Sequence, residues 1–217
     1  MKRILSHAFL ALSLVMIPCP EASAQYESVS QPTITFTKEF PGSYPAYYSI
    51  SVGEKGDARY RLDPDEKPVA FQVSQESAEQ IFALTRKLNR FLGTALESKL
   101  KVAQMGKKTL LFENGDERNQ VSYNHTENPD AMALADLFER LSNTHQHADR
   151  ISYLLRFDRL GIVKELLQIE IDLDQGRLLE PTLLLPNLEK VLSNKALVNV
   201  AHERATGIIA KLQAVKN

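Results

Sequence analysis

The chain has 217 residues, 43% hydrophobic and 24% charged, a composition typical of a globular protein with one large or two small domains. Its formal charge at pH 7 is −1, from 26 basic and 27 acidic residues. This near-neutral mixture lacks the basic excess of a nucleic-acid-binding protein, so no nucleic-acid partner is expected.

The first 24 residues have the pattern of a secretory signal peptide. Lys2 and Arg3 form a positive start, an apolar stretch follows over 4–17, and Ala22-Ser23-Ala24 has the small-x-small form that signal peptidase cleaves. We expect cleavage between Ala24 and Gln25, which predicts an exported protein, periplasmic or extracellular. The alternative is an uncleaved anchor, although the apolar stretch is shorter than the roughly 20 residues of a membrane span.

Cleavage would change the charge and the cysteine content. It removes Lys2, Arg3 and Glu21, which leaves a formal charge of about −2, and it removes Cys19, the single cysteine. Pro18 precedes Cys19, which argues against a lipoprotein. The remaining chain would have no disulfide and no cysteine nucleophile. It contains no later run of membrane-spanning length, so we expect a soluble product without a cofactor.

A flexible N-terminus is predicted over 25–32, and a meander of strands follows. Hydrophobic and polar residues alternate with period two, as in strands with one buried face. Turn sequences rich in Pro, Gly and Asp separate the strands, and such short connections favour antiparallel pairing. The four expected strands cover 33–40, 47–52, 57–62 and 69–73.

The stretch 74–92 predicts an amphipathic helix. Ser74 is the expected N-cap, and Gly93 the expected stop. One side carries hydrophobic residues and a threonine at steps of three and four, and we expect it to pack on the sheet: these are Ala78, Ile81, Phe82, Thr85, Leu88 and Leu92.

After an ambiguous segment, 94–106, the pattern predicts a hairpin and a second helix. Strands are expected over 108–113 and 120–124, joined at Asn114-Gly115 by a loop of more than two residues. Asn128-Pro129-Asp130 opens the second helix, with helical spacing through Leu141. The predicted fold class is therefore α+β, an antiparallel sheet of about six strands with two helices packed on one face.

Beyond about residue 143 the strand period disappears. We expect an all-helical C-terminal module over 143–217, after the α+β domain over 33–142. Residues 184–212 resemble one HEAT-type helical hairpin, but a solenoid needs roughly three repeats. An ordinary helical packing module is the favoured interpretation.

Residues 33–141 resemble an uncharacterised secreted α+β domain family of bacteria, an exported domain of unknown function. The resembling segments are YYSISVGEKGDARY, FQVSQESAEQIFALTRKL, GKKTLLFENG and YNHTENPDAMALADLFERL. The resemblance implies an α+β domain on a secreted chain. It implies no activity and no functional residues.

The most metal-like cluster is His145, His147 and Asp149. Zinc needs three or four convergent ligands, and the local sequence offers no fourth. The favoured interpretation is that these are solvated residues at the start of a helix, so no metal site is predicted. His202-Glu203 begins like a zincin motif, but Thr206 stands at the second histidine position. Asp172-Leu173-Asp174 begins like a calcium loop, but Arg177 and Leu183 stand at positions six and twelve.

With no catalytic signature, the function predicted is that of an exported soluble binding or interaction protein. Its sheet face or its helical tail would bind an unknown protein or envelope component. One alternative is an envelope hydrolase or metal-dependent enzyme with a dispersed site, for which the residues to examine are His125, His145, His147 and His202. The other alternative is a structural component of an envelope assembly.

Overall fold

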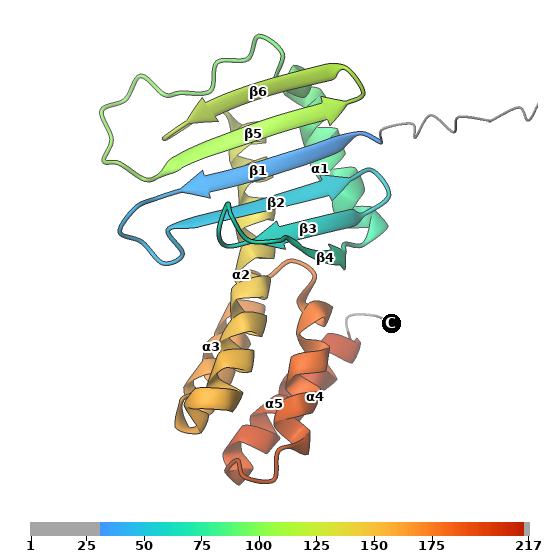
Figure 1. Ribbon diagram of the computed structural model, residues 1–217, viewed down its shortest axis with the longest axis vertical. Helices are drawn as coiled ribbons and strands as arrows, with labels where there is room; N and C mark the ends of the chain where they lie inside the picture. The colour runs from blue at the N-terminus through green and yellow to red at the C-terminus, as the bar shows by residue number, and fades with distance from the viewer. Residues whose placement is uncertain (1–30, 215–217) are drawn as a thin grey trace, which may run out of the picture.

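The protein folds into an antiparallel sheet backed by two helices, with a helical part extending from one end (Figure 1). A computed structural model describes residues 31–214, so the predicted signal peptide lies outside the described residues. The sheet has six strands in the order β4-β3-β2-β1-β5-β6. The strands are β1 (Thr33–Glu39), β2 (Tyr47–Gly53), β3 (Asp57–Arg61), β4 (Val69–Gln72), β5 (Lys107–Asn114) and β6 (Glu117–Tyr123).

The helices complete the predicted α+β fold. Figure 1 shows α1 and α2 behind the same face of the sheet, and α3, α4 and α5 below it, which confirms the expected fold class. Their bounds are α1 (Gln75–Lys87), α2 (Pro129–Phe157), α3 (Ile162–Asp174), α4 (Leu185–Ser193) and α5 (Asn199–Ala214), with short 3₁₀ turns η1 (Asn89–Phe91), η2 (Arg159–Gly161) and η3 (Pro181–Leu184). Within residues 31–214, none of the helices has the length and apolar character needed to cross a membrane.

The hairpin of β5 and β6 is tighter than the sequence suggested. Asn114 pairs with Glu117, so Gly115 and Asp116 form a two-residue turn. The prediction of a longer loop was wrong. It failed because Glu117 to Asn119 look like loop residues locally, whereas pairing with β5 draws them into β6.

Helix α1 begins as predicted but ends earlier. The Ser74 hydroxyl accepts a hydrogen bond from the Ser77 backbone N–H at 3.2 Å. The helix ends at Lys87, and residues 89–91 take left-handed backbone angles. This reversal brings Phe91 into the core, whereas Leu92, expected to be buried, is 60% exposed.

Helix α2 runs unbroken through the point where the sequence suggested a change of module. The Asn128 side chain caps it by accepting hydrogen bonds from the backbone N–H groups of Asp130 and Ala131. Between Pro129 and Gly161 the sequence has neither proline nor glycine, so nothing interrupts the helix. Its first half packs on the sheet, and its second half packs against the C-terminal helices.

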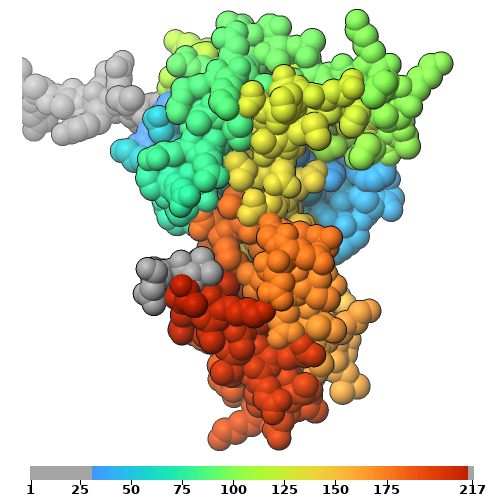
Figure 2. Space-filling model, turned by 180° about the vertical axis from the view of Figure 1, so that it is seen from behind, coloured from blue at the N-terminus to red at the C-terminus, as the bar shows by residue number. Residues whose placement is uncertain are grey.

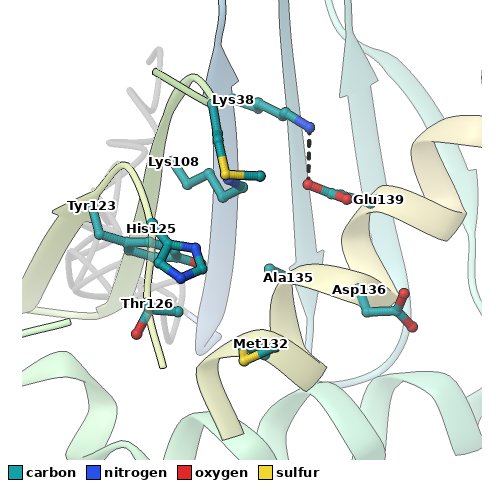
Figure 3. Close-up of a pocket in the computed structure, with 10 residues that line it drawn as sticks. Lys38, Lys108, Tyr123, His125, Thr126, Met132, Ala135, Asp136 and Glu139 are labelled. Carbon is teal, nitrogen blue, oxygen red and sulfur yellow. Dashed lines mark hydrogen bonds and ion pairs between the residues drawn. The ribbon is translucent and has the colours of Figure 1, made fainter. Parts of the chain in front are cut away.

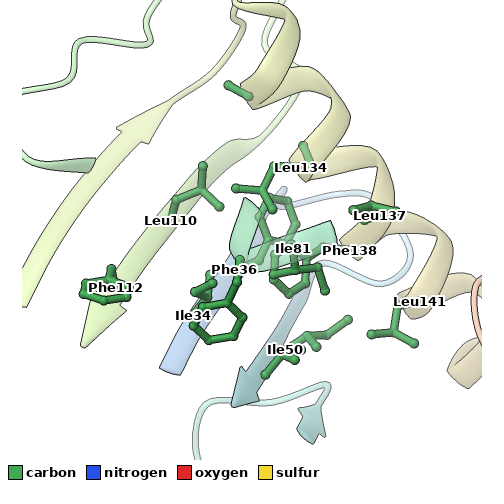
Figure 4. Packing of buried hydrophobic residues seen from close by; sticks show 14 of the residues in the cluster. Ile34, Phe36, Ile50, Ile81, Leu110, Phe112, Leu134, Leu137, Phe138 and Leu141 are labelled. Carbon is green, nitrogen blue, oxygen red and sulfur yellow. The ribbon is translucent and has the colours of Figure 1, made fainter. Parts of the chain in front are cut away.

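Two hydrophobic clusters stabilise the fold. The first lies between the sheet and the helices α1 and α2, where Phe36 stacks on Phe138 with ring centroids 5.3 Å apart (Figure 4). The second joins the C-terminal half of α2 to α3, α4 and α5. Seen from behind, the helical part projects below the broader sheet part (Figure 2). Glu180 joins the two parts because its carboxylate accepts hydrogen bonds from Ser74 N at 2.8 Å and Ser74 Oγ at 2.5 Å.

Candidate binding face

The face of the sheet opposite α1 and α2 is the candidate binding site. No described helix covers it (Figure 1). Side chains of a strand point alternately to the two faces, so the partners of the buried Ile34, Phe36 and Ile50 project here. Most of them carry hydroxyl, amide or guanidinium groups: Thr33, Thr35, Thr37, Ser49, Ser51, Arg59, Arg61, Thr109, Gln120 and Ser122.

Strand register aligns these side chains in two rows. The first row crosses five strands and consists of Ser122, Thr109, Thr37, Ser49 and Arg61. Within it, Thr37 donates to Ser49 at 3.2 Å, and the hydroxyls of Thr109 and Ser122 lie 2.9 Å apart. Neighbouring members of a row are spaced about 4.8 Å apart, the distance between strands.

The second row runs beside the first and consists of Gln120, Leu111, Thr35, Ser51 and Arg59. Both rows therefore end on β3 in an arginine. The result is a hydroxyl-rich face, in which Ser49 is itself buried. Arg59 and Arg61 place positive charge at its β3 side, and at its β6 side Arg118 is paired with Glu113.

Two hollows lie at the arginine end of the rows. The smaller, of about 220 Å³, is lined by Arg59, Arg61 and Pro68, together with side chains of β1 and β2. The larger, of about 540 Å³, adds Lys55 and Asp57. Arg59 lines both. The loop between β3 and β4, residues 62–68, passes in front of the sheet beside them (Figure 1).

The charges of this region favour a weakly acidic ligand. Three basic side chains and one carboxylate line the two hollows. Arg61 Nη1 donates to the Pro64 carbonyl at 2.9 Å, which orients its guanidinium group. The neighbouring loop carries Asp63, Asp65 and Glu66, all exposed. These carboxylates would repel a densely charged polyanion.

The three residues of the metal-like cluster do not form a site. His145 packs in the first hydrophobic cluster, where its ring stacks on Tyr60 with centroids 4.5 Å apart. His147 points to α3, and Asp149 is exposed. Within residues 31–214, no group of three or more acidic, histidine or cysteine side chains is arranged to hold a metal ion.

His147 instead lies between two carboxylates. Its Nδ1 is 2.6 Å from Glu165 Oε1, and its Nε2 is 3.0 Å from Asp172 Oδ2. Burial lowers the pKa of His147, but its hydrogen bonds and charge interactions with Glu165 and Asp172 more than offset this and leave the pKa raised. Asp172, considered above as the first calcium ligand, is occupied by this contact and by Gln168.

The four histidines considered for a dispersed enzyme site have separate surroundings. His145 is in the sheet core, and His147 is in the helical part. His202 Nε2 lies 3.1 Å from the Asn194 carbonyl, and His125 lines a pocket beside β6. They form no common centre.

No known protein-family model matches the chain, and a search of curated proteins finds no match to it. Nothing local in the sequence distinguishes Arg59 and Arg61 from other exposed charges. Alternating threonines and serines were the available signal, but only the pairing of β1 with β5 aligns them into rows.

Proposed function

We propose that the protein is an exported binding protein whose open sheet face holds an acidic polysaccharide of the cell envelope. The observation that carries this proposal is the pair of side-chain rows, mostly hydroxyl-bearing, that end at Arg59 and Arg61. Export is supported by the signal-like residues 1–24. A binding role is also consistent with the absence of a shared histidine or metal centre among residues 31–214.

The chemistry of the face matches such a ligand. A hydroxyl group can donate one hydrogen bond and accept others, which suits the many hydroxyls of a sugar chain. A guanidinium group binds a carboxylate through two parallel hydrogen bonds. An extended chain lying along the rows would make many individually weak contacts, anchored where its acidic groups reach β3.

The charges around the hollows favour a sparsely charged polymer over a nucleic acid. Asp63, Asp65 and Glu66 are exposed in the loop beside the hollows, so a nucleic acid with a charge on every nucleotide would meet repulsion there. A chain with acidic groups spaced among neutral hydroxyl-bearing units places fewer charges near the loop. This favours uronic-acid-type glycans.

Binding of the purified protein to immobilised glycans tests the proposal. We expect retention by a uronic-acid polymer, weaker retention by a neutral glucan, and no preference for single-stranded DNA. The double variant Arg59→Ala/Arg61→Ala should weaken binding to the acidic polymer about tenfold or more, because even one charge-assisted pair contributes about 1.5–3 kcal/mol.

The matched control is Arg86→Ala, since Arg86 is an exposed arginine of α1 on the other side of the sheet. It should bind like the unaltered protein. Equal loss of binding in the control and the double variant, or unchanged binding in both, would contradict the proposed face.

A further inference from the structure

A second pocket lies on the other side of the sheet, where the ends of β1, β5 and β6 meet the first half of α2 (Figure 3). Its volume is about 380 Å³, which is at the small end of the range for small-molecule sites. Lys108 and Tyr123, which face each other across β5 and β6, project into this side. The pocket is therefore distinct from the open face described above.

One wall of the pocket presents hydrogen-bond donors. Lys108 Nζ donates to the Asn124 carbonyl at 3.2 Å and lies 5.9 Å from the centre of the Tyr123 ring. Burial lowers the pKa of Lys108, while Glu139 acts in the opposite direction. His125 lines the same pocket, and in the view of Figure 3 its ring is drawn in front of the Tyr123 side chain.

The hydroxyl of Tyr123 is the unusual group in this wall. Tyr123 is 3% exposed, and its hydroxyl finds no hydrogen-bond partner within residues 31–214. Burial and the charge of Glu139 raise the pKa of Tyr123, so the hydroxyl keeps its proton. A buried donor without an acceptor is unfavourable, and a ligand oxygen placed beside it would relieve that cost.

The charges around the pocket leave one cation for a ligand. Glu139 is paired with Lys38 at 2.9 Å, and Asp136 with Arg140 at 3.7 Å. Among the described residues, Lys108 bonds a neutral carbonyl oxygen and no carboxylate. The site is therefore matched to a single negative charge.

The pocket also has an apolar, adaptable part, formed by Met105 before β5 and by Met132 and Ala135 of α2. Met105 and Met132 are 47% and 53% exposed, and the small side chain of Ala135 lies between α2 and the sheet. Methionine side chains are flexible and fit irregular apolar ligands. Exposed methionines on both sides of a hollow would be covered by a hydrocarbon group.

We propose that this pocket binds a small monocarboxylic acid with an apolar tail. The carboxylate lies between the Lys108 ammonium group and the Tyr123 hydroxyl, after the His125 ring has moved aside. The hydrocarbon tail lies against Met105 and Met132.

Calorimetric titration of the purified protein with octanoate tests the proposal, with octanol and octylamine as tail-matched probes. We expect octanoate to bind, octanol to bind about tenfold more weakly, and octylamine not to bind. Butyrate should bind more weakly than octanoate because it buries less hydrocarbon. Equal binding of octanol and octanoate, or no binding of octanoate at millimolar concentration, would overturn the assignment.

Two variants locate the site. Lys108→Met shortens the side chain by one atom and removes its charge, and it should weaken octanoate binding about tenfold or more. Its matched control is Lys107→Met, the neighbouring exposed lysine, which should bind octanoate normally. Equal weakening in both variants would contradict the pocket.

Tyr123→Phe keeps the ring in place and provides an independent test if Lys108→Met fails to fold. We expect it to weaken octanoate binding about tenfold or more, by loss of one charge-assisted hydrogen bond to the carboxylate. In addition, the methyl NMR signals of Met105 and Met132 should shift on titration of the unaltered protein. If neither methyl signal shifts on titration with octanoate, the ligand lies elsewhere and the proposal is rejected.

Discussion

Two histidines of α2, only two positions apart, have opposite electrostatic environments. Burial lowers the pKa of His145 to about 4, so its ring is neutral beside Tyr60. The pKa of His147 is raised because Glu165 and Asp172 overcome the effect of burial. Residue type alone therefore predicts neither the charge of these side chains nor their surroundings.

The His147 contact predicts a pH-dependent contribution to stability. Its folded-state pKa lies above the unfolded value of about 6.5, so the stabilisation is complete below that value and is lost as the pH rises through the folded-state pKa. His147→Gln should therefore lower the free energy of unfolding by about 1–3 kcal/mol at pH 5.5 and by less at pH 9. Urea unfolding at the two pH values measures this.

The variant Asp172→Asn is the control for the charge interaction, since it keeps the shape of the side chain that contacts His147. It should reduce the dependence of stability on pH without abolishing it, because Glu165 remains. A loss for His147→Gln that is the same at pH 5.5 and pH 9 would show that the ring acts only by packing.

Phe82 and Leu92 test how α1 packs. Phe82 is 4% exposed, and Phe82→Asp would create a cavity and bury a carboxylate, a combined cost above the roughly 3–5 kcal/mol of a Phe→Ala change. We expect the sheet part to unfold, seen as loss of the circular dichroism signal of its strands. The matched change Leu92→Asp, at a 60% exposed position, should alter stability by less than about 0.5 kcal/mol. Native folding of Phe82→Asp would contradict the packing.

At the scale of elements, the carboxylate of Glu180 connects the start of η3 to the start of α1. Glu180 accepts two hydrogen bonds from Ser74, the residue that caps α1. Glu180→Ala should cost about 1–2 kcal/mol and increase amide hydrogen exchange in the first turn of α1. Glu79→Ala, at an exposed position of the same helix, is the control. Unchanged exchange in Glu180→Ala would show that the carboxylate does not hold the joint.

Local patterns were sufficient to predict most elements. Alternation predicted the buried Ile34 and Phe36 of β1, and helical spacing predicted Ile81 and Phe82 of α1. The end of α1 was missed because three successive left-handed residues, none of them glycine, have no clear sequence signal. The continuity of α2 was missed because its buried face changes partner from the sheet to α3, which changes the hydrophobic pattern without breaking the helix.

The candidate sites were less predictable because they depend on contacts between distant segments. Thr37 and Thr109 become neighbours only when β5 pairs with β1. The ion pair of Lys38 and Glu139 joins residues separated by 101 positions. Sequence alternation shows which residues share a face of one strand, but the register between strands decides which functional groups meet.

At the scale of the whole molecule, the sheet separates two proposed binding sites. The glycan face is formed by side chains such as Arg59 on one side, and the carboxylate pocket by Lys108 on the other. Changes at distant sites without shared partners are usually additive within about 0.3–0.5 kcal/mol. The two ligands should therefore bind independently.

Binding measurements on the Arg59, Arg61 and Lys108 variants test whether the two sites bind their ligands independently. Arg59→Ala/Arg61→Ala should leave the affinity for octanoate unchanged, and Lys108→Met should leave retention on the acidic glycan unchanged. Saturation with octanoate should shift the glycan affinity by less than about twofold, the equivalent of 0.3–0.5 kcal/mol. A shift of tenfold or more in the affinity for each ligand when the other is bound would contradict independence. It would mean that β1 and β5 transmit a change from one face of the sheet to the other, since both strands carry residues of both sites.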